Sequence, residues 1–541
     1  MSRTILYTVT PGDPHRRLVE FKAQFPVSED GTARLALSLW RPGRYENANY
    51  AANIQRIAFE QDGVVLSWTK EEPNIWAVHN VHAGVLQVSY TYYTNHLDAG
   101  GCWLDQDQLY LNPVNCFLFN PDHLDLGFTV RFNIPEHFEI ACQLDHGNIC
   151  QIEADSFDEL ADSPVICSPH LIHRSFVMEE CEFHIWIHGK PQFDLGRFEA
   201  DHRAFIAAQV EDFGSMPCEA YHFMYQIPAV RAYHGVEHKN STVIVLGPDT
   251  DSGSEGFYFD LIGIASHELY HAWNVKRLRP AAYSPYNFLK SIPCELGYIY
   301  EGVTTYMGDK YLWLCGVLSS EAYAKKLAAR VQRYLHNPGR HHHSLAASSA
   351  DTWVDGYVAG IPWRKVSIYN EGALVALMID ARIQALTNGE KNIADWMRLL
   401  MDRFGEHSTG YQRADLERAL EDICPWNWHS WFDQYIYDTI DYMQELEEAL
   451  GQMGWKIHLA NAEKPLEHLW GAQCDSKGKI TEVWPGSPAD HCGLWRGDQI
   501  EEVSDSAIEV SKAQSATRLK QHLPHGEHSY FPVVQIIRAG N

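Results

Sequence analysis

Several features that would restrict the class of this protein are missing from its sequence. None of the 12 cysteines forms a Cys-x-x-Cys pair, and their dispersion argues against both a cysteine zinc site and a disulfide scaffold. No apolar run approaches the ~18 residues that a membrane-spanning helix needs, and no basic-then-apolar signal segment opens the chain. Positive charge is scarce, since 43 Lys and Arg stand against 70 Asp and Glu. We therefore expect a cytoplasmic protein that binds neither nucleic acid nor a membrane.

The length of 541 residues exceeds one ordinary core, and the hydrophobic content of 45% indicates folded domains. We expect a multidomain α+β protein in three parts. Residues 1–171 contain short alternating segments between turn clusters, which predict a β-sandwich-like domain. Residues 172–457 contain a few strands and then mainly helical periodicity, and residues 458–541 are again rich in predicted strands.

The stretch from Phe259 to Pro280 contains the motif His-Glu-x-x-His, formed by His267, Glu268 and His271. Its apolar residues recur at helical spacing, Asp260 is a candidate N-cap, and Pro280 marks the end of the helix. One helical turn separates the two histidines, so both imidazoles can bind one metal ion, with Glu268 beside them to handle a proton of water. The alternative is that these are histidines of the core or surface that never bind metal.

Glu295 and Glu301 are the candidates for a third metal ligand, because both lie near the start of a second predicted helix. Glu295 follows Pro293 at a first turn, where the helix dipole stabilises any glutamate. Glu301 lies deeper in the helix among apolar residues, and we therefore favour it. Two histidines and one carboxylate leave an open zinc position for water, as a catalytic site requires.

Two further residues keep alternative interpretations when they are judged from the residues alone. Glu237 follows Gly235 near a strand, where it is either part of a substrate cleft or a solvent-facing edge charge. Tyr369 precedes a predicted helix that begins near Gly372. A tyrosine at this place could hydrogen-bond the oxyanion of a tetrahedral intermediate, or it could be a core residue.

The segment Lys479–Val503 resembles a PDZ domain. It combines a strand, a Gly-Ser-Pro-Ala turn into a short helix, a Gly-Leu break and a Gly-Asp turn into the next strand. A PDZ domain implies binding of a peptide C-terminus by strand addition. The alternative is a purely structural cap on the catalytic part.

Together with this PDZ-like segment, four motifs give the chain a resemblance to the glycyl aminopeptidase family of PDZ-containing zinc metallopeptidases, which are gluzincins. They are Trp-x-Pro-Gly-x-Tyr ending at Tyr45, Tyr-x-Gly-Val-Glu-His ending at His238, the run from His267 to Pro280, and Glu-Gly-x-Thr-x-Tyr ending at Tyr306. The run from His267 to Pro280 is the most specific of them.

The resemblance implies a thermolysin-like catalytic domain over 172–457 and a PDZ-like domain over 458–541. It implies one catalytic Zn²⁺ bound by His267, His271 and Glu301, with Glu268 as the general base.

The resemblance also addresses the substrate. Related aminopeptidases have a Gly-led strand that ends in a Glu bound to the free amine, which assigns Gly235 and Glu237 to substrate binding. It implies Tyr369 as the oxyanion stabiliser, although Ser367–Gly372 departs from the paired tyrosines and Lys-Gly that the family usually has.

The sequence therefore predicts a zinc-dependent aminopeptidase that removes N-terminal residues from peptides with a free N-terminus. The family name suggests small first residues, Gly or Ala. One alternative is a zinc endopeptidase in which Glu237 anchors no amine, and another is a PDZ-bearing adaptor with an inactive peptidase fold. The intact His267, Glu268, His271 and Glu301 set disfavours the adaptor.

Overall fold

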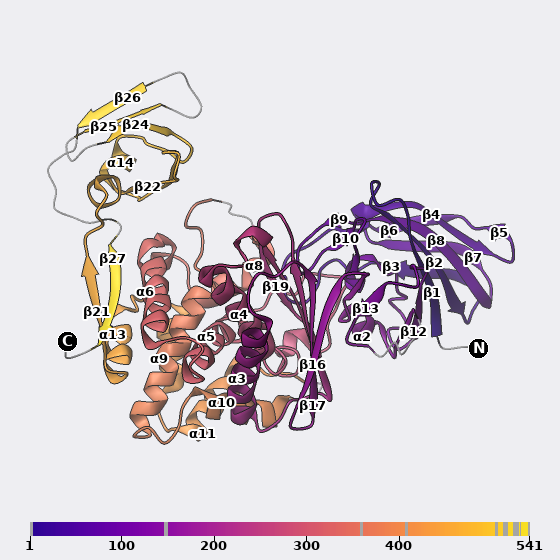
Figure 1. Cartoon of the computed structure of the whole chain (residues 1–541), viewed down its shortest axis with the longest axis horizontal. Coiled ribbons are helices and arrows are strands. Elements are labelled where there is room, and N and C mark those ends of the chain that lie inside the picture. Colours follow the sequence, from indigo (N-terminus) through magenta and orange to yellow (C-terminus); the bar gives the residue numbers. More distant parts are fainter. Residues whose placement is uncertain are drawn as a thin grey trace.

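The computed structural model describes residues 4–144, 150–357, 361–405, 409–503, 507–511, 518–522, 530 and 532–538. Parts of the predicted C-terminal domain, 458–541, therefore lie outside the described residues. Figure 1 shows an N-terminal β region, a central region that contains most of the helices, and a small C-terminal lobe. The β-rich start and the helical centre confirm the predicted multidomain α+β class.

A seven-stranded sheet organises the N-terminal region. Alternation of apolar and polar residues produces it: in β2 (Leu18–Val27), Val19 and Phe21 are buried while Glu20 and Lys22 are exposed. Neighbouring strands are antiparallel except β1 and β12, which are parallel. The order is β14 (Gln151–Ala154), β12 (Gly127–Phe132), β1 (Thr4–Pro11), β2, β8 (Gly84–Tyr93), β4 (Ile54–Gln61) and β5 (Val64–Val65).

Two smaller antiparallel sheets complete this region. The first is β3 (Gly31–Ala36), β7 (Ile75–Val81) and β6 (Trp68–Glu72). The second has the order β13 (Glu139–Ala141), β15 (Val165–Ser168), β11 (Leu109–Leu111), β10 (Cys102–Leu104) and β9 (Asn95–His96). The helices are short: α1 (Pro113–Cys116), α2 (Phe157–Ala161) and a 3₁₀ turn at Tyr50–Asn53.

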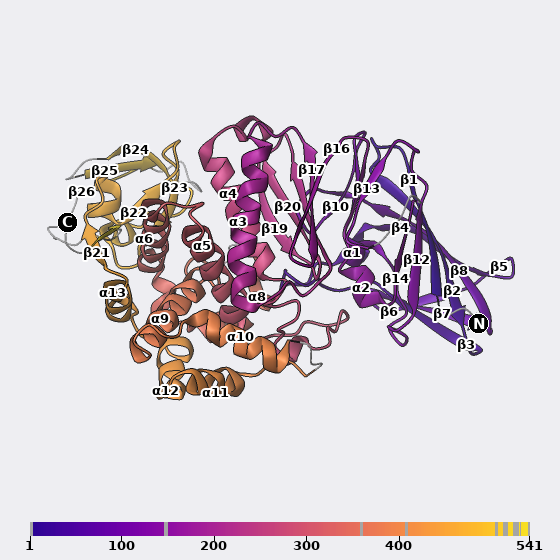
Figure 2. The ribbon, with the colours of Figure 1, turned by 60° about the horizontal axis from the view of Figure 1, so that its bottom comes forward.

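A five-stranded mixed sheet opens the central region and is covered on both faces. Helices α3 (Leu195–Phe213) and α4 (Glu255–Tyr270) pack on one face. Apolar residues of the N-terminal region, including Tyr110 and Ile166, pack on the other, so the sheet stands between α3 and the N-terminal strands in Figure 2. The order is β16 (Leu171–Met178), β17 (Cys181–Gly189), β18 (Ala220–Ile227), β20 (Ser241–Gly247) and β19 (Ala232–Glu237). Strand β19 is therefore an edge strand.

The rest of the central region is helical. A π-helical turn, Tyr298–Val303, leads directly into α5 (Thr304–Leu314) and crosses α9 (Asn370–Leu386) where Gly302 meets Gly372. A Cβ on Gly302 would lie 2.5 Å from the Cα of Gly372, so only glycine permits this approach. The other helices are α6 (Ser320–His336), α7 (Leu345–Ala350), α8 (Thr352–Asp355), α10 (Ile393–Phe404), α11 (Arg413–Ile423), α12 (Trp428–Phe432) and α13 (Met443–Gln452).

The C-terminal lobe begins and ends on the helices of the central region. Strand β21 (Trp455–Ala460) pairs with β27 (Val533–Arg538), and the backbone N–H of Val534 donates to the Gln332 side chain of α6 at 3.2 Å. Figure 1 shows the lobe extending away from this pair. Between them lie β22 (Ala472–Cys474), β23 (Ile480–Val483), α14 (Pro488–His491), β24 (Gln499–Val503), β25 (Ala507–Ser511) and β26 (Arg518–His522). Within the described ranges, no helix combines the length and apolarity needed to cross a bilayer.

Candidate active site

Helix α4 presents the His-Glu-x-x-His residues, but it begins earlier than the sequence predicts. Its N-cap is Ser254, whose hydroxyl accepts the backbone N–H of Phe257 at 3.2 Å. The prediction of Asp260 as the N-cap was wrong, because this residue lies in the second turn with an exposed side chain. The helix ends at Tyr270, so His271 caps its C-terminus while keeping helical backbone angles.

Three potential metal ligands meet at the C-terminal end of α4. The Nε2 atoms of His267 and His271 are 3.1 Å apart, and Glu301 Oε2 lies 3.7 Å from the first and 3.5 Å from the second. Ligand atoms ~2.0–2.1 Å from a tetrahedral metal ion lie about 3.3 Å from one another. The spacing of these three atoms therefore fits a single Zn²⁺ ion.

Hydrogen bonding orients the His271 imidazole for this role. Its Nδ1–H donates to the backbone carbonyl of Asn274 at 2.7 Å, which leaves the Nε2 lone pair facing His267 and Glu301. The Asn274 amide in turn donates to the Ile299 carbonyl at 2.9 Å and to the Thr304 hydroxyl at 3.1 Å, next to the turn that carries Glu301. Sequence reasoning missed Asn274, although it lies in the most specific motif.

The π-helical turn directs Glu301 toward the two histidines. Glu301 is buried, whereas the competing candidate Glu295 is exposed and lies outside this cluster. Burial raises the pKa of the Glu301 carboxyl, but His271 and His267 outweigh it and hold the pKa below its usual value. The carboxylate therefore stays ionised, as a metal ligand must be.

Glu268 lies beside the ligand cluster, with its carboxylate buried next to the edge strand. Its side chain is buried, and Oε2 has no partner among the residues that the structure describes. Burial raises the pKa of Glu268 well above its usual value; His271 opposes this shift, and the nearby carboxylates Glu237 and Glu301 add to it. A Cβ on Gly235 would lie 2.3 Å from Glu268 Oε1. Glycine at 235 thus leaves room for the carboxylate against the edge strand.

Glu237 lies at the end of β19 and is not a solvent-facing charge. It is 3% exposed, and its Oε1 atom has no hydrogen-bond partner in the described part of the chain. The loop around Trp40 and Tyr45 closes over it, since a Cβ on Gly43 would lie 2.4 Å from Glu237 Oε2. Gly43 has a φ of +78°, so two constraints require glycine there.

Tyr369 is a half-buried residue of the cavity wall and not a core residue. Its ring centroid is 6.5 Å from that of His267, and burial raises its pKa well above the usual value. The hydroxyl of Tyr357 lies 3.4 Å from the Tyr369 hydroxyl. Tyr357 belongs to a preceding loop and had no signal in the sequence, so a second tyrosine at this place is a finding of the structure.

One cavity of about 390 Å³ contains all the residues that the sequence nominates. These residues are Gly235, Glu237, His267, Glu268, His271, Glu301 and Tyr369. Further lining comes from Gly43 and Arg44 of the N-terminal region and from a group of charged residues on α5 and α6. The site therefore lies between the edge strand, α4 and the helices that follow it.

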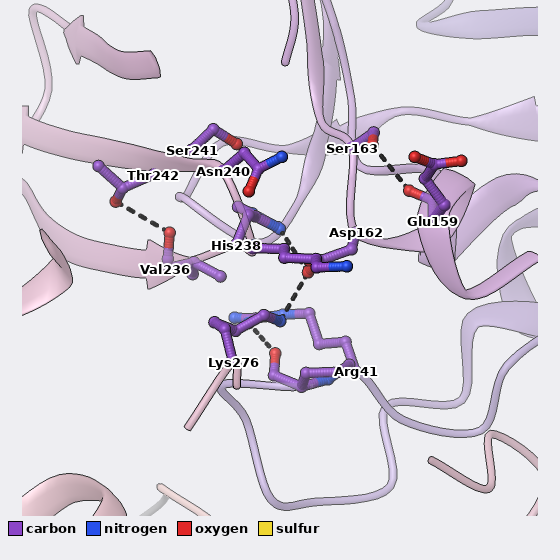
Figure 3. A network of polar contacts seen from close by, with 12 residues as sticks. Arg41, Glu159, Asp162, Ser163, Val236, His238, Asn240, Ser241, Thr242 and Lys276 are labelled. Atoms are coloured by element: carbon purple, nitrogen blue, oxygen red, sulfur yellow. Dashed lines mark hydrogen bonds and ion pairs between the residues drawn. The ribbon is translucent and has the colours of Figure 1, made fainter. Parts of the chain in front are cut away.

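A second buried ionic cluster fastens the site to the N-terminal region, as Figure 3 shows. Lys276 lies six residues after the end of α4, and its ammonium donates to Asp162 Oδ1 at 2.6 Å. His238 Nδ1 lies 3.2 Å from the same oxygen. The backbone N–H of Lys239 donates to Asp162 Oδ2 at 2.7 Å. Both Glu237 and the end of α4 are thus fixed to one carboxylate from the preceding domain.

Comparisons with known proteins agree with this architecture. Two family models match: the Peptidase M61 N-terminal domain at residues 6–169 and M61 glycyl aminopeptidase at 260–375. The crystal structure of an aminopeptidase N family protein from Idiomarina loihiensis is similar, with a TM-score of 0.91 and 22% identity over 99% of this chain and 98% of that one. A mutant M1 zinc metallopeptidase from Deinococcus radiodurans has a TM-score of 0.50 and 13% identity over 81% and 94%. A search of curated proteins finds no match.

Because both sequence identities are low, the two structural similarities establish the fold and nothing more. The two family models together match just over half of the chain, and the second spans His267, His271, Glu301 and Tyr369. The chain therefore belongs to the M61 glycyl aminopeptidase family and is a metallopeptidase.

Proposed function

We propose that this protein is a zinc-dependent aminopeptidase that removes single residues from the free N-terminus of peptides. The observation that carries the proposal is the Glu237 carboxylate, which lines the cavity and is buried there with an oxygen that has no partner among the described residues. A buried carboxylate without a partner is costly, and a substrate ammonium group would supply the missing charge and hydrogen bonds.

In this proposal His267, His271 and Glu301 hold one Zn²⁺ ion. When bound, zinc supplies a Lewis acid for the peptide carbonyl and lowers the pKa of water at the site. Glu268 takes the proton of the attacking water on its unpartnered Oε2 and passes it to the leaving amine. Burial raises the pKa of Glu268 above its usual value, and a raised pKa makes a carboxylate a better proton acceptor.

The edge strand β19 orients the substrate. An extended peptide can add to this edge, and Gly235 lets its backbone approach beside Glu268. Glu237 then binds the substrate amine and fixes the register at one residue from the N-terminus. The Tyr369 hydroxyl donates a hydrogen bond to the carbonyl oxygen as negative charge develops on it.

A preference for small first residues, Gly or Ala, is part of the proposal. The loop of Gly43 approaches Glu237 so closely that a methyl group on the glycine would overlap the carboxylate. Arg44 and Tyr357 line the cavity next to this loop. A first residue with a large side chain would have to displace these groups.

We also propose the domain boundaries 1–171, 172–457 and 458–541, with the last domain PDZ-like. Strand β23, helix α14 and strand β24 follow one another as a PDZ domain requires, and the lobe has a small core of its own, including Trp470, Ile480 and Leu494. A peptide C-terminus is the expected ligand of such a domain.

The test is hydrolysis of Gly- and Ala-anilides by the full chain, with chelator, zinc add-back and an N-acetyl-Gly-anilide control. We expect zinc-dependent release from the free-amine substrates alone, and loss of that discrimination in Glu237→Gln. Equal cleavage of the acetylated substrate would favour the endopeptidase. Absence of turnover with zinc bound would favour the inactive adaptor.

A further inference from the structure

A row of cations forms the wall of the cavity beyond the catalytic residues. Lys326, Arg330 and Arg333 of α6 all line the cavity, and their spacing of four and three residues puts them on one face of the helix. The position that a Cβ on Gly263 would take lies 3.6 Å from the Lys326 ammonium, one turn before His267 on α4. Such a row stands out in a chain with a net charge of −27.

The cations of this row differ in what neutralises them. Asp309, which is buried on α5, accepts Lys326 Nζ at 3.0 Å and Arg330 Nη2 at 2.5 Å. Asp260 is exposed near Lys326. Arg333 is exposed and has no hydrogen-bond or ion-pair partner in the described ranges of the chain. It is therefore the cation that is available to a ligand in the cavity.

The edge strand places these cations downstream of the scissile bond. Glu237 is at the C-terminal end of β19, and Tyr233, near the other end, lies within electrostatic reach of Arg330 and Arg333. A peptide whose amine is at Glu237 and which adds antiparallel to β19 runs past Gly235 toward Tyr233. The four residue-to-residue steps from Glu237 to Tyr233 span about 13 Å. The second to fourth substrate residues consequently come within reach of the two arginine side chains.

We propose that Arg333, supported by Arg330, binds a carboxylate on the leaving-group side of the substrate. The carboxylate is either an acidic side chain at the second to fourth position or the C-terminal carboxylate of a short peptide. Either source offers the planar, bidentate acceptor that a guanidinium group prefers. This inference rests on the proposed aminopeptidase function and names the class of peptide that the site favours.

Two pairs of peptides separate the two sources. Gly-Ala-Glu-amide against Gly-Ala-Gln-amide tests the side chain, and Gly-Ala-Gln free acid against its amide tests the C-terminus. For the zinc-loaded full chain we expect kcat/KM to be about fivefold higher for the charged member of at least one pair. Arg333→Gln abolishes the preference, and Arg333→Lys retains part of it. Lys325→Gln removes a charge from the same helix outside the cavity and leaves the preference intact.

Binding provides a second readout. Calorimetric titration of zinc-loaded Glu268→Gln with the same peptides should show the same order of affinities. The advantage of the charged peptide should decrease as the salt concentration is raised. This inference would be overturned by equal kcat/KM and equal affinity within both pairs, or by a preference that survives in Arg333→Gln. Turnover of Gly-anilide in the same experiments would still support the aminopeptidase. Failure of all free-amine substrates, Gly-anilide included, would overturn the proposed function and this inference with it.

Discussion

Two buried ionic clusters include residues of the motif from His267 to Pro280, one at Glu268 and the other at Lys276, and they differ in how their charges are satisfied. At the first, Glu268 and Glu237 are buried, yet each has a carboxylate oxygen with no partner in the described part of the molecule. At the second, both oxygens of Asp162 accept hydrogen bonds, and the buried Lys276 ammonium lies 2.6 Å away.

This difference separates structure from function. A buried charge with a partner can stabilise the fold, whereas one without a partner costs stability unless a ligand compensates it. The Asp162 cluster joins the N-terminal region to the segment that follows α4. Burial raises the pKa of the Asp162 carboxyl, but Lys276 and His238 outweigh this effect and hold the pKa below its usual range. At Glu268 burial dominates instead: His271 and Arg41 oppose it, but Glu237 and Glu301 add to it, and the pKa of the carboxyl is raised well above its usual value.

The largest expected effect is on activity at the unsatisfied cluster. Glu268→Gln keeps the shape of the side chain but removes the proton acceptor, so kcat/KM for Gly-anilide should fall by about 10³-fold or more. Its melting temperature should not fall, because the carboxylate has no protein partner to lose. The measurement is turnover and thermal unfolding of the zinc-loaded proteins. A clear loss of stability would mean that Glu268 is a structural residue and would break the comparison.

The satisfied cluster should respond in the opposite way. Lys276→Met leaves Asp162 buried with one partner fewer, and the free energy of unfolding should fall by about 3–5 kcal/mol. The double variant Asp162→Asn, Lys276→Met should recover part of this loss, because removing a whole pair costs less than breaking it. Urea unfolding of the three proteins with zinc present measures both values. A double variant that is less stable than Lys276→Met would contradict this account.

Periodicity and motif spacing predicted much of the framework. Helical periodicity predicted a mainly helical part within residues 172–457, and the structure has helices there that include α3 (Leu195–Phe213) and α6 (Ser320–His336). Helix α4 was predicted with the wrong N-cap. Asp260 and Ser254 are both good capping residues, and the helix extends to Glu255 with Phe257 and Tyr258 buried in its first turn.

The arrangement of the site was most directly predictable where one element carries several of its residues. His267, Glu268 and His271 share one helix, so spacing alone brings them together. Whether Glu237 is an edge charge depends on the loop of Gly43, almost 200 residues away, which buries it. Likewise, nothing near Tyr369 in sequence indicates that the Tyr357 hydroxyl lies 3.4 Å from its own.

The third prediction concerns the stability contributed by a buried neutral side chain, His202, whose two ring nitrogens both have hydrogen-bonding partners. His202 is fully buried; its Nδ1–H donates to the Phe198 carbonyl at 2.7 Å and its Nε2 lies 2.5 Å from the Tyr225 hydroxyl. Burial lowers the pKa of His202 to about 4. Since the unfolded pKa is about 6.5, the unfolded chain binds a proton between these values that the folded chain does not, and stability is lost as pH falls from 6.5 to 4.

This group alone should lower the free energy of unfolding by about 3 kcal/mol over that interval. The measurement is urea unfolding at pH 7 and pH 4.5 for the wild type and His202→Gln, in which the pH-dependent part should shrink. His15→Gln, at an exposed position, is the matched control and should leave the pH dependence unchanged. An equal change in the free energy of unfolding between pH 7 and pH 4.5 in all three proteins would show that His202 does not resist protonation.

The smallest expected effect tests whether the two tyrosines at the cavity share one role. Tyr369 lies against His267, whereas Tyr357 is 41% exposed on the cavity wall, with its hydroxyl 3.4 Å from the Tyr369 hydroxyl. Tyr369→Phe should therefore lower kcat/KM for Gly-anilide about tenfold to a hundredfold, and Tyr357→Phe only about twofold to threefold, with no change in melting temperature. If Tyr357→Phe caused the greater loss, the oxyanion donor would be the tyrosine of the loop. The departure of Ser367–Gly372 from the family pattern would then mark a transfer of that role between two segments of the chain.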